Sequence, residues 1–325
     1  MQIYVVTAGD NVDKIAEQFG VGVESLIYDN QLVAPYRLAV GQALLIDDGG
    51  IRENRKSAYF RGFAYPFISQ YVLEQTLASL SELAVFSYGF TREGNLISPA
   101  LDDTFMIEAS LRNRAEPILT LTPFDASGKF SNELISAVIN NPDAVNTLIG
   151  ELLQTMQEKG FLGVDIDFEY IKAQDRDTFV EFVRSVTETM NANGYSVSVD
   201  LAPKVSADQP GLLYEGKNYA ALGAIANSVL VMTYEWGYTY GPPMAVAPIN
   251  KVRQVLDYAV TEIESTKINV GIPNYGYDWP LPYEKGVTKA KTLGNIEAVQ
   301  LAISKGAEIQ FDEVATVSYT HLRAH

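Results

Sequence analysis

The chain has 325 residues, of which 47% are hydrophobic and 20% charged, and its formal net charge at pH 7 is −16. This composition is typical of a soluble globular protein with one large domain or two unequal ones. The acidic balance argues against binding to nucleic acid or to anionic membranes, because phosphate groups are bound by clusters of basic residues. No stretch is long and apolar enough to predict a transmembrane helix.

Few kinds of catalytic side chain are available. The chain has no cysteine, and its two histidines, His321 and His325, lie within the last five residues. Disulfides, thiol chemistry, a Ser-His-Asp triad and a histidine-bound zinc are therefore not expected, which leaves mostly carboxylates as acids and bases. The N-terminus lacks the basic-then-apolar order of a secretory signal, so the chain is either a cytoplasmic product or a mature form without its signal.

The first 47 residues are predicted to form a small separate unit. Apolar residues at helical spacing, with a turn at Gly9 and a stop at Gly20, indicate the order strand–helix–helix–strand. The expected elements are residues 3–6, 12–19, 23–28 and 41–46. Either Asp10 or Asn11 is placed to cap the first helix. Residues 48–57, which combine glycines with mixed charges, are predicted to be a linker.

From residue 58 onward, predicted strands and amphipathic helices alternate. The strands are expected at residues 59–67, 83–90, 117–124, 161–170, 195–204, 229–236 and 268–275, and the clearest helices at 143–159, 176–193 and 249–264. Repeated βα units predict an α/β fold with a parallel sheet, either a (β/α)8 barrel or a doubly wound sheet. No glycine-rich phosphate loop follows a strand, which counts against the doubly wound alternative.

The most informative segment is residues 163–169, Gly-Val-Asp-Ile-Asp-Phe-Glu. Asp165, Asp167 and Glu169 alternate with apolar residues, so in a strand the three carboxylates share one face. Their mutual repulsion costs stability, which is more often tolerated at a functional site than in a scaffold. Glu169 lies at the C-terminal end of the strand, where barrel enzymes carry catalytic groups. The alternative is an edge strand with a solvated acidic face.

The N-terminal unit resembles a LysM module. The matching segments include Tyr4-Val5-Val6, Ala8-Gly9-Asp10, Phe19-Gly20-Val21 and Val40-Gly41-Gln42. This resemblance implies binding of N-acetylglucosamine chains in a shallow groove between the first strand–helix loop and the loop before the last strand. The residues implied are Gly9, Asp10, Asn11, Asn30 and Leu32. Asp10 and Asn30 could instead serve only as helix caps.

The remainder resembles glycoside hydrolase family 18, whose signature is Asp-x-x-Asp-x-Asp-x-Glu. The last three acids of that pattern fall on Asp165, Asp167 and Glu169, whereas Leu162 stands at the first. Residues 232–235, Met-Thr-Tyr-Glu, correspond to the family's Met-x-Tyr-Asp, and residues 271–277 are similar to its seventh strand. The glycine pair usual in the third strand is absent. This resemblance implies a (β/α)8 TIM barrel over residues 58–316.

The resemblance also implies roles for these residues in a substrate-assisted, retaining hydrolysis. Glu169 would protonate the glycosidic oxygen, and Asp167, sharing a proton with Asp165, would orient the substrate's N-acetyl group. Tyr234 would hydrogen-bond the acetamide oxygen. The implied sugar-binding residues are Met232, Glu235, Trp236, Tyr275, Tyr277 and Trp279. The four aromatic residues among them could instead pack the barrel or its loops, and the chemistry calls for no metal or other cofactor.

Four further segments are similar to the spore-cortex-lytic N-acetylglucosaminidases of that family: residues 64–67, 201–204, 232–237 and 275–279. The implied function is cleavage of β-1,4 bonds after N-acetylglucosamine in peptidoglycan of the spore cortex, with the LysM module as anchor. The implied location is the bacterial spore coat, cortex or cell wall. The alternatives are a chitinase and a non-catalytic protein that binds N-acetylglucosamine polymers.

The C-terminal region is expected to leave the barrel incomplete. Only seven barrel strands are predicted, followed by a helix at residues 295–304 and a short possible strand at 308–311. The family's eighth strand carries a tryptophan, and none follows Trp279. Residues 317–325 resemble a translated cloning adaptor, so we expect a non-native tail and a missing last strand and helix.

Overall fold

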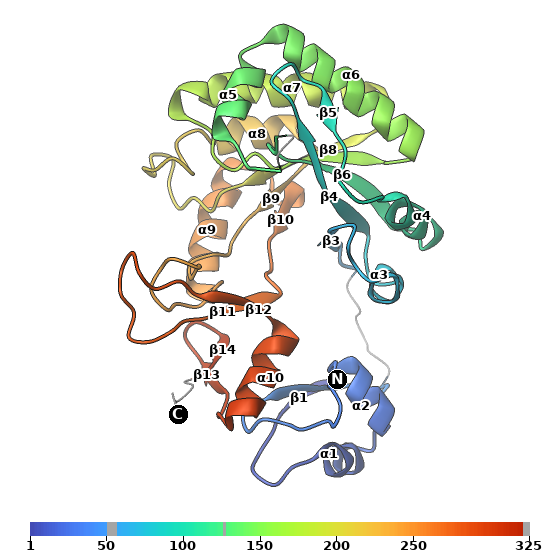
Figure 1. The fold of residues 1–325 in the computed structure, drawn as a ribbon, viewed down its shortest axis with the longest axis vertical. Coiled ribbons are helices and arrows are strands. Elements are labelled where there is room, and N and C mark those ends of the chain that lie inside the picture. Colours follow the sequence, from blue (N-terminus) through green and yellow to red (C-terminus); the bar gives the residue numbers. More distant parts are fainter. Residues whose placement is uncertain (51–56, 126–127, 321–325) are drawn as a thin grey trace. The chain divides into compact units, whose positions relative to one another are not determined.

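A computed structural model of the chain describes residues 1–50, 57–125 and 128–320 (Figure 1). The chain divides into two compact units, the first containing residues 1–56, 234–253 and 272–325, and the second 57–233 and 254–271. Most of the linker expected at 48–57 lies outside the described residues. None of the helices in the described part is both long and apolar enough to cross a membrane.

The N-terminal part of the first unit has the predicted strand–helix–helix–strand order. Its elements are β1 (Gln2–Val5), α1 (Val12–Phe19), α2 (Val23–Asp29) and β2 (Ala43–Ile46). The strands pair antiparallel, with Gln2 opposite Ile46. Asn11 is the helix cap, because its side chain accepts from the Lys14 amide, and Gly20 ends α1 at a φ of 67°. A small core of its own includes Val6, Val12, Ile15, Ala16, Leu26, Leu44 and Ile46.

The second unit is built on seven parallel strands, as predicted. They are β3 (Arg61–Ala64), β4 (Glu82–Phe90), β6 (Glu116–Leu121), β7 (Gly163–Ile166), β8 (Ser196–Leu201), β9 (Ser228–Val231) and β10 (Ile268–Val270). The spatial order is β10-β9-β8-β7-β6-β4-β3, and β5 (Leu96–Ile97) adds to β4 antiparallel. This order is that of a (β/α)8 barrel, in which consecutive parallel strands are neighbours.

Helices connect these strands. They are α3 (Gln70–Leu77), α4 (Thr104–Arg112), α5 (Asn132–Ile139), α6 (Pro142–Lys159), α7 (Arg176–Ala192), α8 (Tyr219–Ile225) and α9 (Ile249–Glu262). The three helices predicted from periodicity are confirmed within two residues at each end. Helix α6 shows why: Asn141 caps it, Pro142 opens it and Gly160 ends it at a φ of 85°.

The predicted strand at residues 268–275 is wrong in its second half. β10 ends at Val270, and Tyr275 begins a separate strand, β11 (Tyr275–Asp278), which pairs antiparallel with β12 (Lys291–Gly294). Pro273 lies in the break; proline lacks the amide proton that a continuing strand would donate. After β12 comes α10 (Asn295–Lys305), close to the predicted helix.

The sheet is open in the described part of the chain. β3 and β10 are its edges, each paired with one neighbouring strand. Residues 308–311 do not close it, since β13 (Gln310–Asp312) pairs antiparallel with β14 (Val317–Tyr319). The fold is therefore an incomplete TIM barrel, as the sequence predicted, preceded by a βααβ module.

Candidate active site

The acidic segment lies in the middle of the sheet. β7 is flanked by β6 and β8, with Asp165 in register with Thr120 on one side and Ser198 on the other. Asp165 is fully buried and Asp167 is 7% exposed, whereas Glu169, just beyond the strand end, is half-buried. The alternative of an edge strand with a solvated acidic face is therefore wrong.

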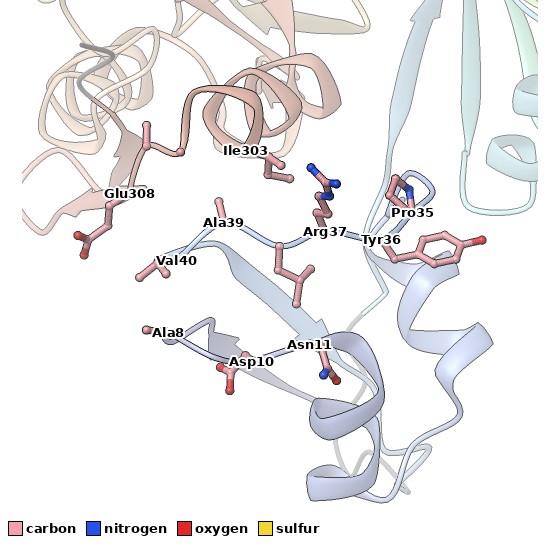
Figure 2. Close-up of a pocket in the computed structure, with 13 residues that line it drawn as sticks. Ala8, Asp10, Asn11, Pro35, Tyr36, Arg37, Ala39, Val40, Ile303 and Glu308 are labelled. Carbon is pink, nitrogen blue, oxygen red and sulfur yellow. The ribbon is translucent and has the colours of Figure 1, made fainter. Parts of the chain in front are cut away.

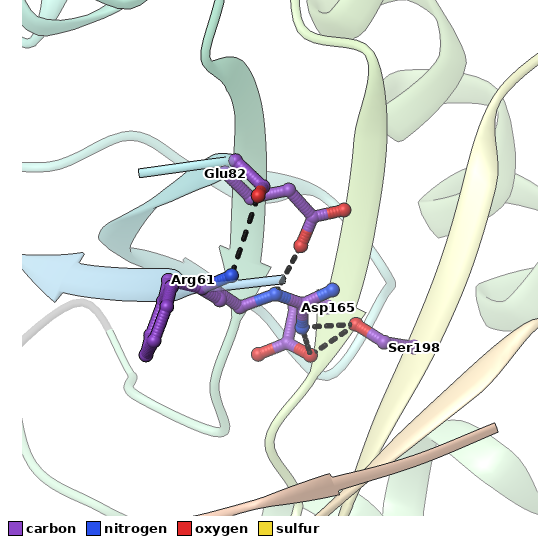
Figure 3. Close-up of polar contacts among 6 residues, drawn as sticks. Arg61, Glu82, Asp165 and Ser198 are labelled. Carbon is purple, nitrogen blue, oxygen red and sulfur yellow. Dashed lines mark hydrogen bonds and ion pairs between the residues drawn. The ribbon is translucent and has the colours of Figure 1, made fainter. Parts of the chain in front are cut away.

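Asp165 has a buried counterion that the sequence did not predict (Figure 3). Arg61, on β3, donates from Nη1 to Asp165 Oδ1 at 2.9 Å and to Ser198 Oγ at 2.6 Å. Its Nε bonds to Glu82, and Ser198 Oγ donates to Asp165. Burial raises the pKa of Asp165, while the guanidinium and the Ser198 hydroxyl lower it. The cation beside Asp165 favours its anionic form.

Asp167 is in a different environment. Burial, with repulsion from Glu169 and Asp165, raises its pKa to about 8, although Lys217 opposes this shift. The raised pKa favours the protonated form of Asp167 near neutral pH. Among the described residues, Asp167 Oδ1 and Asp165 Oδ2 are buried without a hydrogen-bond partner. Buried oxygens without a protein partner usually bond to water or to a ligand.

A fourth acid, Asp200 on β8, was missed by the sequence analysis. It is 3% exposed, and burial followed by repulsion from Asp165 and Asp167 raises its pKa well above the ordinary value. Its Oδ1 also lacks a partner among the described residues. The sequence does contain a signal for Asp200, because Ser196, Ser198 and Asp200 alternate with apolar residues, as Asp165 and Asp167 do.

Three of the residues predicted to bind sugar, Tyr275, Tyr277 and Trp279, form a cluster with Glu235 in the first unit. Glu235 Oε1 accepts from Tyr275 Oη at 3.1 Å and from Tyr277 Oη at 3.0 Å. Its φ of 64° is unusual for a residue with a side chain and is a form of strain found at functional sites. Trp279 continues the cluster, with its ring 5.5 Å from that of Tyr277. All three aromatic rings are half-buried, so they retain surface for a ligand.

The remaining predicted residues divide between the two units. Tyr234 and Trp236 belong to the first unit, where Lys251 Nζ lies 5.4 Å from the Trp236 ring centre. Met232 belongs to the second, with the four acids, and its amide bonds to Leu201. In the described residues, no group of three or more histidine, cysteine or acidic side chains is placed to hold a metal.

In the LysM-like module, two of the five predicted residues line a cavity of about 800 Å³ (Figure 2). Asp10 and Asn11 form one side, and residues 35–40 form another; Ile303 and residues 306–308 complete it. Gly9, Asn30 and Leu32 are not among the lining residues.

Two of these side chains also have local structural roles. Asp10 Oδ2 accepts from Tyr4 Oη at 2.7 Å and from the Thr7 amide at 2.7 Å. Asn30 bonds to the carbonyls of Leu26 and Leu45 and accepts from the Leu45 amide, so it joins α2 to β2. The Asn30 amide group therefore already bonds to backbone groups of the module.

Comparison with known proteins shows the families of both domains. Residues 83–323 match the family model for glycosyl hydrolases family 18, and residues 4–47 match the LysM domain. The chain belongs to glycosyl hydrolase family 18 and is a glycosidase with an N-terminal LysM domain. Both domains indicate binding of glycans.

The chain is also similar to individual proteins of known type. The chain is 35% identical to the cortical fragment-lytic enzyme of Bacillus subtilis, over 98% of this chain and 85% of that protein. It is similar to the crystal structure of the Bacillus megaterium spore cortex-lytic enzyme SleL, with 33% identity and a TM-score of 0.77 over 97% of this chain and 73% of that one. A Chromobacterium violaceum chitinase is 25% identical, with a TM-score of 0.74 over 82% of this chain and 83% of that one.

Proposed function

We propose that the chain cleaves β-1,4 bonds after N-acetylglucosamine in spore cortex peptidoglycan. The observation that carries this proposal is the buried acid pair at the end of β7, in which Asp165 has a cationic partner and burial beside other acids raises the pKa of Asp167. The similarity to cortical fragment-lytic enzymes over nearly the whole chain supports cortex as the substrate.

The proposed mechanism needs no carboxylate nucleophile. Glu169 transfers its proton to the glycosidic oxygen as the bond to the anomeric carbon breaks. The substrate's own acetamide oxygen attacks that carbon and forms a cyclic oxazolinium ion, with Asp167 orienting the acetamide N–H. Water, activated by the Glu169 carboxylate, then opens the ring with retained configuration. Tyr234 hydrogen-bonds the acetamide oxygen in this proposal, and Glu235 with its tyrosines holds the sugar.

The LysM domain accounts for localisation at the spore or cell wall. A chain with a net charge of −16 is not attracted electrostatically to an anionic wall polymer, so short-range recognition has to localise it. Tethering to the polymer raises the effective concentration of the hydrolase there.

The test is digestion by wild type and Glu169→Gln. We expect the substitution to lower turnover of cortex fragments by about 1,000-fold or more and to leave oligosaccharide binding nearly unchanged, because only the acid proton is lost. The measurement is product masses by mass spectrometry together with binding by calorimetry. Glu188→Gln, on the exposed side of α7, is the matched control and should retain full turnover.

Chitin hydrolysis is the second candidate, favoured by the similarity to a bacterial chitinase. Parallel digestion of cortex fragments and chitin oligomers separates the two, because muramic acid residues change the product masses. Faster cleavage of chitin would assign a chitinase. Full turnover in Glu169→Gln would remove the proposed acid, and binding without hydrolysis by the wild type would indicate a non-catalytic glycan-binding protein.

A further inference from the structure

A buried lysine, Lys217, lies beside the acidic residues and has no part in the mechanism above. It is in the loop between β8 and α8 and its side chain is fully buried. Its Nζ donates to the Phe168 carbonyl at 2.5 Å and to the Asp200 carbonyl at 2.9 Å. Lysine is rarely buried without a partner, so the ammonium needs a reason for being there.

The Phe168 carbonyl is a critical acceptor, because Phe168 separates Asp167 from Glu169. Its ring is already fixed by stacking on Phe182, at 5.6 Å between ring centres. The bond from Lys217 therefore restrains the backbone of the same residue whose side chain is anchored in the core. Together the two contacts hold the short segment that carries both proposed catalytic carboxyls.

The loop that carries Lys217 is packed closely against this segment. Gly216 approaches the backbone so tightly that a Cβ atom there would lie 2.2 Å from the Ile171 carbonyl oxygen. Only glycine permits that approach. The loop is therefore pressed against residues just beyond Glu169, and Lys217 is directed at Phe168.

We propose that Lys217 is a positioning residue of the glycosidase site, which holds the Asp167–Phe168–Glu169 segment through the Phe168 carbonyl and provides the buried positive charge that these carboxylates face. This inference rests on the proposed function, since it assumes that Asp167 and Glu169 do the chemistry.

The charges around Lys217 agree with this role. It faces Asp167 and Glu169 after β7 and Asp200 on β8; burial lowers its pKa to about 8, and the three carboxylates act in the opposite direction. Lys204 also lies close by, because its Nζ donates to the Lys217 carbonyl at 3.2 Å. Arg61, in turn, is paired with Asp165 and Glu82. Lys217 is therefore the cation that lowers the pKa of Asp167.

The first measurement compares Lys217→Met with wild type on a soluble N-acetylglucosamine oligomer. Methionine preserves much of the volume without the charge or the donor, so we expect kcat to fall about 100-fold through misplacement of the acid, with KM changed less than about threefold. Both limbs of the pH–rate profile should move upward by roughly half a unit or more, because carboxylates without a nearby cation keep their protons to higher pH. Lys217→Arg, which keeps the charge, should restore the profile.

Thermal unfolding gives a readout that does not depend on turnover. The pKa of Lys217 is about 8 in the folded chain against an ordinary 10.5, so between these values the unfolded state binds more protons. Stability from this group therefore rises with pH over that window. The Tm of wild type minus that of Lys217→Met should increase from pH 8 to 10.5.

The matched control is Lys267→Met, which also removes a lysine that bonds to backbone carbonyls, those of Gly223 and Ala226 at the end of α8, at 2.9 Å. It should lower Tm without moving the pH–rate limbs. If Lys217→Met does not fold, Lys217→Met combined with Asp200→Asn removes the lysine together with an acidic group that it faces, and is compared with Asp200→Asn alone.

A Lys217→Met enzyme, or that double variant against its reference, with unchanged kcat and unshifted limbs would overturn the proposal. Glu169→Gln separates this failure from failure of the proposed function. An inactive Glu169→Gln beside an unaffected Lys217→Met refutes the role of Lys217 alone, whereas full turnover in Glu169→Gln refutes the site.

Discussion

At the scale of single residues, neighbouring charges shift the pKa values of chemically similar carboxyl groups. Asp165 lies on β7 and Asp167 just beyond its end, two positions later in the chain, and Arg61 forms an ion pair with Asp165. A cation beside a buried acid favours its anionic form, and neighbouring acids favour its protonated form. Arg61 therefore lowers the pKa of Asp165 and Lys217 that of Asp167, while burial raises both.

This arrangement predicts that the site costs stability at neutral pH. The pKa of Asp167 is raised from 3.8 to about 8, so between those values the folded state holds more protons than the unfolded state. Stability from this group is present at low pH and is lost as pH rises towards 8. Asp167→Asn should thus be more stable than wild type by roughly 1 to 3 kcal/mol at pH 8 and nearly equal at pH 4.

Denaturant unfolding at a series of pH values measures this, with exposed Asp208→Asn as the control that should follow wild type. The same Asp167→Asn variant should hydrolyse N-acetylated substrates at least about 10-fold more slowly, because the acetamide loses its orienting partner. Parallel stability curves for wild type and Asp167→Asn would contradict the assigned protonation.

At the scale of elements, the open sheet is the main feature. β3 and β10 present unpaired edges in the described part of the chain, and β10 has only three residues. Unpaired edges expose backbone groups and favour association with other chains. We propose that residues 58–316 are an incomplete barrel that an eighth strand and helix would close, and that residues 317–325 are not part of it.

The corresponding prediction replaces residues 317–325 with a family-like closing strand and helix. We expect Tm to rise by about 5 °C or more, because two edge strands gain partners and apolar surface is covered. Differential scanning calorimetry and turnover should improve together. If the unaltered chain already melts in one sharp transition and hydrolyses its substrate, a closing segment is unnecessary and the proposal is wrong.

At the scale of the whole molecule, a glycan-binding module and a glycosidase are joined in one chain. Residues 1–47 contain their own core, including Ile15, Leu26 and Leu44, so we expect this segment to fold alone and to bind N-acetylglucosamine polymers. Deleting it should lower activity on insoluble wall about 10-fold or more and spare soluble oligomers, because only the polymer benefits from tethering. Sedimentation assays measure binding to the polymer, and reducing-end release measures hydrolysis. Equal losses of activity on both substrates would mean that the module acts structurally.

Local periodicity and turn residues were enough to predict the module order, the seven strands and the acidic segment that begins on β7. It could not predict the break after Val270, since an apolar stretch does not reveal where strand pairing ends. Tyr275 and Tyr277 were named from a motif, but only the fold shows that both donate to Glu235.

Which acids have counterions can be seen only in the folded chain. Arg61 lies 104 residues before Asp165, and Lys217 lies 49 residues after Phe168, so no local pattern connects them. Parallel strands bring such residues together through crossover connections, and burial then makes each pairing matter far more than it would in water. The identity of the acids was readable in the sequence; their protonation depends on distant cations that only the folded chain places beside them.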